Sequence, residues 1–345
     1  MIYLIGAGLN GLCTAYYLSR KKQPVTIIER NSSYSLEASY INGCQNYYSR
    51  ILPLTVFIRQ SVKNNNLLSY LETPSLLWTE RKWFVKFLFS RFQEKKNMLF
   101  CNKLQKLSRI CFEDITQNSL EKIEPIIDNG VVKEGDYVTH SRQFSELVYN
   151  KCLEQKVDFK FNTRLKSIVV EKNKNGSRVV DIITEPPLNP PFDPGEDKVV
   201  FCTGIYTKKF LDIPLLGFYG FSVIKPAKDI PSQINIRNNV QHIIIGGEER
   251  IVGGVLVSNK VEATSKIFNK LYIDLPGEKY CYARPVSPNG LPIIGKYKNY
   301  SNLYVNTGQG FLGYTLSAVC GFLCSRCILD DIDVDIDIFK KFLNQ

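Results

Sequence analysis

The stretch Ile2-Tyr-Leu-Ile-Gly6-Ala-Gly8-Leu-Asn-Gly11 decides the fold of this 345-residue chain. Its glycines have the spacing Gly-x-Gly-x-x-Gly, follow four apolar residues and precede a helix-like pattern. A second apolar run, Pro24 to Ile28, ends at Glu29. A strand, a glycine turn, a helix and a second strand with an acidic end form the full dinucleotide-binding fingerprint. The sequence therefore predicts a Rossmann-like βαβ unit at the start of an α/β protein.

The glycines of this fingerprint have distinct physical roles. Gly6 permits the tight turn, Gly8 lets a pyrophosphate approach the backbone, and Gly11 lets the helix pack on the strand. The N–H groups and dipole of the helix N-terminus favour a phosphate. Glu29 can accept hydrogen bonds from a ribose and would repel a 2′-phosphate, which disfavours NADP. The fingerprint leaves FAD and NAD both open.

Two distant segments favour FAD. Val199 to Gly204 is an apolar strand that ends in a Thr-Gly turn. Asn306 to Thr315 carries Gly308, Gly310 and Gly313 ahead of an apolar helix. Glycines there would let backbone press on a flat ring, and the helix N-terminus would stabilise negative charge on a reduced flavin.

Composition is that of a globular protein of about two domains. Apolar residues make up 44% and charged residues 22%, which argues against disorder, a fibre or a coiled coil. The two histidines, His140 and His242, leave little room for a Ser-His-Asp triad or a multi-histidine metal site. We expect no metal.

The cysteines and the N-terminus predict an intracellular protein, either cytoplasmic or bound to the periphery of a membrane. The ten cysteines lie in apolar segments, as is typical of reduced, buried thiols. The first residues form a strand and lack a signal peptide. We see no run of 18 apolar residues, so we expect no transmembrane helix. Cys320, Cys324 and Cys327 have the spacing of one type of iron–sulfur site, but one face of a helix is the favoured interpretation.

The net charge of +11 leaves several partners open. It suits a nucleic acid, an anionic membrane or an anionic substrate, and it also suits a lysine- and asparagine-rich genome. The segment Thr79 to Phe92 is basic, aromatic and amphipathic, so it could lie on a membrane surface. Packing of its aromatic face on the core is the favoured alternative.

The remaining chain alternates helices and strands. Periodicity predicts helices over 10–20, 140–156 and 261–272, mostly helix over 56–125, a hairpin of 167–170 with 179–184, strands over most of 215–275, and a loop or edge over the acidic segment 330–337.

With these segments in place, the chain resembles the D-amino-acid oxidase superfamily of flavoproteins, above all the D-amino-acid dehydrogenase small subunits. The resemblance covers most of the chain in the right order. The matching stretches, besides the fingerprint with Glu29-Arg30, are Ala38 to Gln45, Gly135-Asp136, Phe159 to Thr163, Val199 to Gly204, Asp212 to Pro214, Tyr219 to Ser222, Ala283 to Gly295 and Asn302 to Thr315.

The resemblance implies a Rossmann-like FAD-binding domain and a second, α+β domain built on an antiparallel sheet, both discontinuous. The FAD-binding domain would comprise 1–55, 140–214 and 283–345. The substrate domain would comprise 56–139 and 215–282.

The resemblance also implies the site residues. Leu165 would meet the adenine through its backbone, Thr203 and Gly204 would meet the edge of the cofactor, and residues 308–315 would line the flavin. The predicted cofactor residues are Gly6, Ala7, Gly8, Asn10, Gly11, Glu29, Arg30, Ser39, Asn42, Gln45, Leu165, Thr203, Gly204, Gly308, Gly310, Phe311, Leu312, Gly313 and Thr315.

Arg284 would hold the substrate carboxylate, because a guanidinium binds a carboxylate in a bidentate manner. The alternative for Arg284 is an interdomain ion pair. His242 and Arg50 are weaker catalytic candidates on the substrate side, with a strand residue and a surface charge as their respective alternatives.

The implied reaction is deamination of a D-amino acid by hydride transfer to flavin N5, with a quinone or oxygen as the electron acceptor. Three departures put turnover in doubt. A segment of the substrate domain is missing between Phe112 and Thr116, Tyr219 replaces a common lysine, and Gln309 replaces a common histidine. A related amine oxidase acting on glycine, sarcosine or a modified tRNA base stays open, as does an FAD-binding protein without turnover. A nucleic acid partner is disfavoured but left open.

Overall fold

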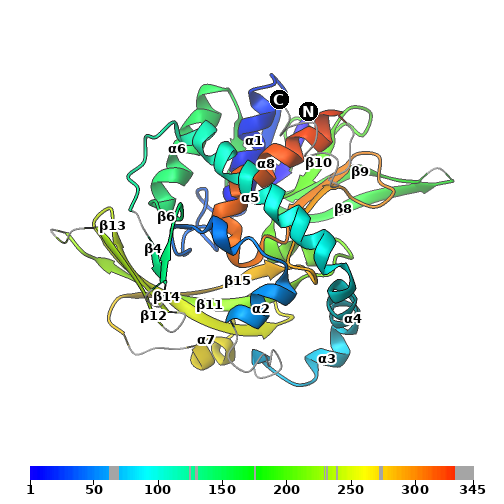
Figure 1. Ribbon diagram of the computed structural model, residues 1–345. Helices are drawn as coiled ribbons and strands as arrows, with labels where there is room; N and C mark the ends of the chain where they lie inside the picture. Colours follow the sequence, from blue (N-terminus) through cyan, green and yellow to red (C-terminus); the bar gives the residue numbers. More distant parts are fainter. Residues whose placement is uncertain are drawn as a thin grey trace.

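The computed structural model describes the chain except for residues 62–69, 124–125, 129–130, 175, 229, 231, 238–239, 272–274 and 331–345. The acidic segment predicted as a loop therefore lies almost entirely outside the described residues. Two sheets organise the molecule, with the helices α1, α5, α6 and α8 in the upper half of Figure 1 and the strands β11, β14 and β15 in the lower half.

The first sheet is built on the fingerprint. Its six strands are, in spatial order, β16 (Ile293–Lys296), β17 (Leu303–Thr307), β10 (Lys198–Phe201), β1 (Ile2–Ile5), β2 (Val25–Ile28) and β7 (Asp158–Lys160). All neighbours are parallel except β16, which is antiparallel to β17. The residues of β1, β2 and β17 are buried throughout, as expected for parallel strands covered on both faces.

Four helices form the largest core against this sheet. They are α1 (Leu9–Ser19), α5 (Glu94–Thr116), α6 (Ser141–Glu154) and α8 (Gly313–Asp330). A Cβ on Gly321 of α8 would lie 2.5 Å from the backbone of Cys13 on α1, so this glycine permits the close helix contact. Phe112 and Ile115 of α5 are fully buried in the same core. Thus α5, predicted within the substrate part, packs on the helices of the first sheet.

The second sheet is mainly antiparallel. Its strands are, in order, β15 (Glu278–Val286), β11 (Leu216–Pro226), β14 (Glu248–Ser258), β13 (Val240–Ile245), β12 (Gln233–Arg237), β4 (Ile126–Asp128) and β5 (Val131–Lys133), and only β12 with β4 is parallel. The predicted combination of a Rossmann-like unit and an antiparallel second sheet is confirmed. The predicted domain boundary at 282/283 falls within β15.

Smaller elements complete the fold. They are β3 (Gln45–Asn46) paired with β6 (Tyr137–Val138), the hairpin of β8 (Arg164–Asn173) and β9 (Gly176–Glu185), the helices α2 (Leu54–Ser61), α3 (Leu76–Thr79), α4 (Arg81–Ser90) and α7 (Ser265–Leu271), and the 3-10 turns η1 (Tyr48–Arg50), η4 (Arg91–Gln93), η5 (Gly204–Lys209) and η6 (Gly310–Leu312). The hairpin projects to the right in Figure 1. The predicted helices and the hairpin are confirmed.

The C-terminal helix α8 corrects one expectation. The segment Gly310–Leu329 is long and apolar enough to cross a membrane by length and composition, although no such stretch was expected. Its 18-residue apolar window is 72% buried within the protein, so it is the core helix of the first sheet. Cys320, Cys324 and Cys327 lie on it as buried free thiols, which confirms the helical interpretation.

Candidate cofactor and substrate site

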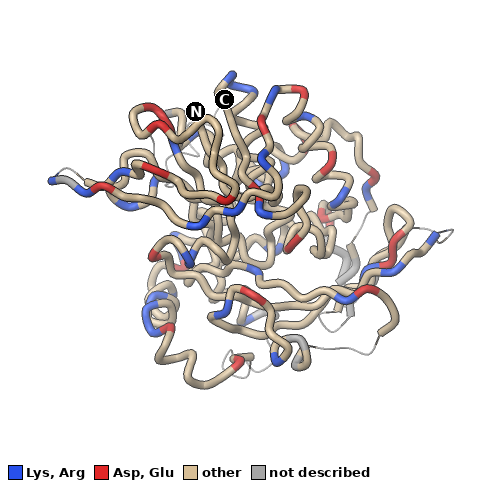
Figure 2. The backbone as a smooth tube through the Cα atoms, turned by 180° about the vertical axis from the view of Figure 1, so that it is seen from behind, with Lys and Arg blue, Asp and Glu red and all other residues tan. Residues whose placement is uncertain are grey.

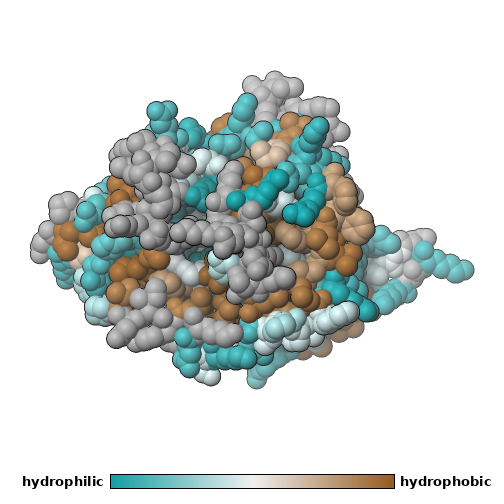
Figure 3. Space-filling view, turned by 60° about the horizontal axis from the view of Figure 1, so that its bottom comes forward, coloured by the Kyte–Doolittle hydropathy of each residue, from teal (hydrophilic) through white to brown (hydrophobic). Residues whose placement is uncertain are grey.

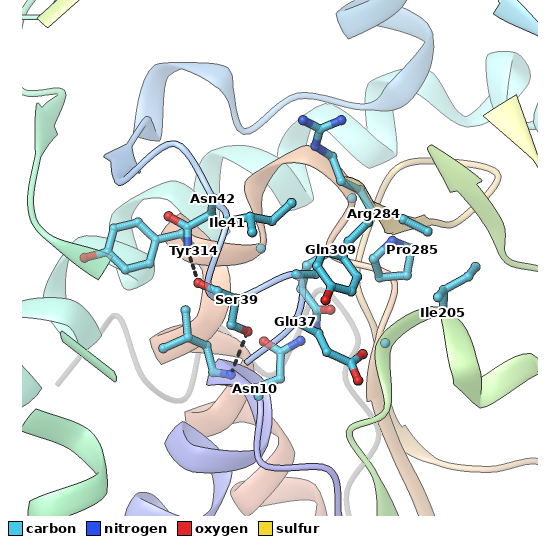
Figure 4. Close-up of a pocket in the computed structure, with 18 of the residues that line it drawn as sticks. Asn10, Glu37, Ser39, Ile41, Asn42, Ile205, Arg284, Pro285, Gln309 and Tyr314 are labelled. Carbon is cyan, nitrogen blue, oxygen red and sulfur yellow. Dashed lines mark hydrogen bonds between the residues drawn. The ribbon is translucent and has the colours of Figure 1, made fainter. Parts of the chain in front are cut away.

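A cavity of about 840 Å³ begins at the carboxyl ends of β1, β2 and β10 and is lined by residues of both sheets. Ligands of open parallel sheets bind at this edge. Figure 4 shows Asn10, Ser39 and Asn42 on one side of the cavity and Arg284, Pro285 and Gln309 on the other. The first side comes from the fingerprint and the loop after it, and the second from β15 and the turn before α8.

The fingerprint turn is held by the buried carboxylate of Glu29. Its two oxygens accept hydrogen bonds from the backbone N–H groups of Ala7 and Asn31, each at 2.8 Å. Burial raises the pKa of Glu29, and these two hydrogen bonds oppose the rise. Gly6 has φ +104°, and a Cβ on Gly11 would lie 2.0 Å from the carbonyl oxygen of Gly6. Gly11 therefore serves helix packing and does not line the cavity.

The loop after β2 continues the wall through short polar contacts. Ser39 Oγ accepts a hydrogen bond from the N–H of Leu9 at 3.1 Å, and Asn42 Nδ2 donates to the carbonyl oxygen of Ser39 at 2.5 Å. Thr315 Oγ1 at the start of α8 donates to the carbonyl oxygen of Gln45 at 2.9 Å. These bonds connect three separated parts of the sequence around one cavity.

A fully buried arginine fixes the same loop to the second sheet. Arg250 on β14 donates from Nη1 to the carbonyl oxygens of Tyr40 and Asn42, at 3.0 and 3.3 Å. Its Nη2 lies 2.9 Å from Glu248 Oε2, and Glu248 also accepts a hydrogen bond from Arg142. Burial opposes ionisation of Glu248, but His140, Arg250 and Arg142 lower its pKa to about 2.

The cavity wall fits a flat, polar cofactor such as FAD. Four buried polar atoms that line it have no hydrogen-bond partner in the described structure, namely Asn10 Oδ1, Ser35 Oγ, Gln45 Nε2 and Gln309 Oε1. A Cβ on Gly204 or Gly313 would meet nothing within 4 Å. Buried polar atoms are rarely left unpaired, so these atoms and the bare backbone at the two glycines mark surfaces that a ligand covers.

At the end of the cavity next to η6, the guanidinium of Arg284 lies among aromatic side chains. Arg284 lies opposite Phe218 in the register of β15 and β11, and a Cβ on Gly220 would be 2.2 Å from Arg284 Nη1. The guanidinium carbon is 5.5 Å from the centre of the Phe311 ring, and Phe57 stacks on Phe311 at 4.8 Å. Gly220 thus provides the space that the guanidinium occupies.

Arg284 has no carboxylate partner among the described residues. Its one hydrogen bond is long, 3.4 Å from Nη1 to the carbonyl oxygen of Gly254. Desolvation lowers the pKa of Arg284 to about 10, so the side chain stays charged at neutral pH. The side chain is partly exposed because it faces the cavity. A cation so placed is suited to bind the carboxylate of a ligand.

The structure brings most of the predicted site residues to this one cavity. Those that line it are Gly6, Gly8, Asn10, Glu29, Arg30, Ser39, Asn42, Gln45, Leu165, Thr203, Gly204, Gly310, Phe311, Leu312, Gly313, Thr315, Arg284 and Arg50. Ala7 and Gly308 do not line it, and neither does Gly11. Ala7 is fully buried and bonds Glu29, while Gly308 has φ +83° and packs on Ile293.

His242 needs correction as a catalytic candidate. It lies on β13 outside the cavity lining, with Nε2 2.6 Å from Glu249 Oε1. Its neighbour Gln241 lines the cavity instead, because successive side chains of a strand point to opposite faces. The alternative interpretation of His242 as a strand residue agrees with its position.

Sequence reasoning missed the residues that shape the end of the cavity around Arg284, which we call the arginine end. Phe57, Phe218 and Gly220 lie far apart in the chain, and no local motif joins them. The two departures noted from the family pattern have different positions. Tyr219 points away from the cavity and donates to the carbonyl oxygen of Lys260 at 3.1 Å, whereas Gln309 lines the cavity. Within the described residues, no group of three His, Cys, Asp or Glu side chains is placed to hold a metal ion.

Comparison with known proteins supports the cofactor assignment. The model of the DAO family, described as FAD dependent oxidoreductase, matches residues 2–326. D-amino acid dehydrogenase of Neisseria meningitidis serogroup C is 23% identical over 396 aligned residues, which cover 92% of each chain. Because the alignment is longer than the 345 residues of this chain, that relative carries segments that this chain lacks.

Two solved structures show the same fold. Glycine oxidase from Bacillus cereus has a TM-score of 0.60 at 16% identity and covers 96% of this chain and 98% of its own. L-alpha-glycerophosphate oxidase from Mycoplasma pneumoniae, solved with FAD bound, has a TM-score of 0.58 at 16% identity and covers 95% and 94%.

Proposed function

Because the chain belongs to the DAO family of FAD-dependent oxidoreductases, we propose that it oxidises the amine-bearing carbon of an amino acid, with D-amino acids as the substrate class. The D-amino acid dehydrogenases among its relatives support the substrate class. Asn10, Ser35, Gln45 and Gln309 each have one buried polar atom without a partner among the described residues, and they would hold FAD together with the backbone at Gly204 and Gly313.

The observation that carries this proposal is Arg284. An α-amino acid always presents a carboxylate, and Arg284 is a charged guanidinium that faces the cavity with no carboxylate of the described residues paired to it. It lies against Phe311, in the turn η6 before α8. The arginine would therefore fix the carboxylate, and with it the position of the α-carbon.

The chain contributes mainly position and apolar surroundings. Phe57, Phe218 and Phe311 form an apolar wall beside the guanidinium, so a ligand that displaces the cavity water there would meet a stronger attraction for its carboxylate. No histidine lines the cavity within the described residues, so the chemistry relies on orientation of the α-hydrogen more than on a histidine base. FAD held by these residues would supply the acceptor for the α-hydrogen and its electron pair. The amine nitrogen loses a proton, and water then hydrolyses the released imine to a keto acid and ammonia.

The test is anaerobic reduction of the purified yellow protein. We expect D-amino acids to bleach the flavin absorbance, whereas the matching L-amino acids leave it oxidised. Bleaching by glycine or sarcosine alone would favour the amine oxidase alternative. Absence of bleaching by every amino acid and amine tested would contradict the proposal and leave an FAD-binding protein without turnover.

We propose that the electron acceptor is a quinone, with oxygen as the alternative outcome. We also propose that the protein is located inside the cell or at the periphery of a membrane. All ten cysteines are free and buried, which supports a reducing compartment. Mixing the substrate-reduced protein with a soluble quinone under nitrogen, or with air, distinguishes the two acceptors by the rate at which flavin absorbance returns.

A nucleic acid substrate has less support. Figure 2 shows Lys and Arg spread over the molecule and interspersed with Asp and Glu. Several basic residues at the cavity are neutralised by acidic ones, as in the pairs Arg30 with Glu37, Lys166 with Glu185 and Lys209 with Glu262. A polyanion would require a continuous basic surface beside the cavity.

A further inference from the structure

Helix α4 has two apolar faces, and only one of them packs on the protein. The inner face consists of Trp83, Phe87 and Ser90, at the spacing of one helix face. Trp83 is buried, stacks on Phe87 at 5.5 Å and donates from Nε1 to the carbonyl oxygen of Val286 at 3.0 Å. This face accounts for the predicted packing of aromatic residues on the core.

On the outer face, the predicted packing of aromatic residues on the core is wrong. Val85, Leu88 and Phe89 of α4 and Phe92 of the following turn η4 have the spacing i, i+3, i+4, i+7, and all four are exposed. Phe89 is 63% and Phe92 is 86% exposed. Trp78 on α3, at 80%, and Leu99 on α5 extend the same run of chain. We call these six residues the α4 surface. In Figure 3, hydrophobic residues gather on the right, the side on which Figure 1 places α4.

Basic side chains surround the α4 surface. Arg81, Lys82, Lys86, Arg91, Lys95 and Lys96 are all exposed, and none forms a salt bridge among the described residues. The two acidic residues of this segment are already paired, Glu80 with Lys208 at 3.1 Å and Glu94 with Arg59. The blue segments at the lower left of Figure 2 mark this concentration of positive charge. The segment therefore combines exposed aromatic residues with an excess of positive charge, which Asp212 beside Lys82 and Lys86 and Glu94 beside Arg91 offset only in part.

We propose that the α4 surface docks on an anionic lipid bilayer. A helix that lies in a membrane interface has Trp, Phe and Leu on one side and Lys and Arg beside them, because the rings enter the boundary of the acyl chains while the ammonium groups reach the lipid phosphates. A protein partner would supply particular acidic residues, whereas six cations around an apolar patch match a surface of uniform negative charge.

The position of the α4 surface connects it to the site. Trp83 lies 6.2 Å from the ring of Phe218, which lies 5.6 Å from the ring of Phe311 at the arginine end of the cavity. Docking would thus bring the arginine end of the cavity towards the membrane, where apolar quinones dissolve. Vesicle binding requires no turnover, so this inference stands or falls independently of amino acid oxidation.

The test is co-sedimentation of the FAD-loaded protein with vesicles. We expect the protein to sediment with an equimolar mixture of phosphatidylcholine and phosphatidylserine, much less with phosphatidylcholine alone, and less at high salt. F89S/F92S should lower the vesicle-bound to free ratio at least tenfold. K82Q/K86Q should lower it about thirtyfold, because each basic residue near an anionic surface contributes about 1 kcal/mol.

Matched controls come from the hairpin of β8 and β9, which lies above α4 on the same side of Figure 1. I183S removes an apolar side chain of β9 that is 45% exposed, and K172Q/K174Q removes the same charge as K82Q/K86Q. Both controls should bind vesicles as the natural protein does, and all variants should retain FAD and melt at the same temperature.

Three results would overturn the proposal. The first is absence of sedimentation of the natural protein with anionic vesicles at low salt. The second is equal loss of binding in the controls. The third is a dimer in light scattering that F89S/F92S converts to a monomer, since a second copy of the chain would then cover the α4 surface.

Discussion

Replacing Arg284 by methionine should affect the free protein and the substrate complex in opposite directions. In the folded chain, desolvation lowers the pKa of this guanidinium from its ordinary value to about 10, and no carboxylate compensates it among the described residues. Each pKa unit corresponds to 1.36 kcal/mol, but the side chain faces a cavity that water can enter, which screens the effect. We therefore expect Arg284→Met to raise the free energy of unfolding of the FAD-loaded, substrate-free protein by about 1 to 2 kcal/mol.

The direction of this effect follows from proton linkage. Between pH 10 and 12.5 the unfolded chain binds the proton more tightly than the folded chain, so the stability of the natural protein rises with pH in that window. Below pH 10 the guanidinium of Arg284 is protonated in both the folded and the unfolded chain, so the folded chain bears the full cost of desolvating this charge. The gain from Arg284→Met should therefore be visible at neutral pH as a rise in Tm of a few degrees.

The effect on substrate should be a large loss of affinity. Removing one member of a desolvated charged pair costs about 2 to 5 kcal/mol, so the substrate concentration that half-saturates anaerobic flavin reduction should rise about 30-fold or more. The reduction rate at saturation should fall less, provided that the flavin stays bound. Thermal denaturation and stopped-flow absorbance measure the two quantities on the same preparation.

Arg250→Met is the matched control. Arg250 is fully buried, whereas Arg284 is partly exposed, and Arg250 pairs with Glu248 and donates to the carbonyl oxygens of Tyr40 and Asn42. Its loss should lower stability by about 3 to 5 kcal/mol, because it leaves the Glu248 carboxylate with one cation fewer. If Arg284→Met lowers Tm as Arg250→Met does, and if it leaves substrate affinity unchanged, Arg284 is a structural residue and the reasoning is refuted.

Three further predictions concern the cofactor wall and its support. Gly313→Ala should fold with an unchanged Tm in the FAD-free protein and bind FAD at least tenfold more weakly, because its Cβ would meet no protein atom within 4 Å and would occupy the cavity. Gly11→Ala should lower the Tm itself, since its Cβ would lie 2.0 Å from a carbonyl oxygen. Equal effects of the two variants on FAD titration and on Tm would contradict the different roles given to these two glycines. Glu29→Ala leaves the N–H groups of Ala7 and Asn31 without their acceptor, so it should lower stability by about 1 to 3 kcal/mol and release FAD, seen as a rise in free-flavin fluorescence; unchanged FAD retention would argue against Glu29 as a cofactor residue. Glu248 has a folded-state pKa lowered to about 2, so its stabilising effect is present above its ordinary pKa near 4.5 and is lost as the pH falls from about 5 to 2. The Tm of Glu248→Gln should therefore depend less on pH in this window than the Tm of the natural protein. Parallel curves of Tm against pH would show that this carboxylate does not contribute to the pH dependence of stability.

The cofactor side of the site could be predicted because its residues are local in sequence. Gly6, Gly8 and Gly11 act within one turn, and Glu29 follows at the end of the adjacent strand, so spacing alone places them together. Each has a conformational or hydrogen-bonding role that few other residues can fill. The structure adds the hydrogen-bond donors of Glu29, which are the backbone N–H groups of Ala7 and Asn31. The carboxylate keeps lone pairs that a ligand can use.

The arginine end could not be built in this way. Gly220 makes room for Arg284 only because β11 and β15 pair in one particular register, and Phe57 reaches Phe311 from a helix more than 250 residues earlier. A shift of one residue exchanges the two faces of a strand, which is why Gln241 lines the cavity and His242 does not. Strand register depends on contacts between distant segments, and no local pattern encodes it.

By itself, the sequence determined that this chain begins with a dinucleotide-binding unit, that its cysteines are placed as core residues, and that its C-terminal glycines precede an apolar helix. Those properties follow from spacing and periodicity, which act over a few residues. Only the tertiary structure decided that α5 joins the core of the first sheet, that Arg284 lacks a carboxylate partner among the described residues, and that α4 exposes a second apolar face. Burial and ion pairing depend on what the rest of the chain places beside a residue, and that is fixed only when distant segments pack.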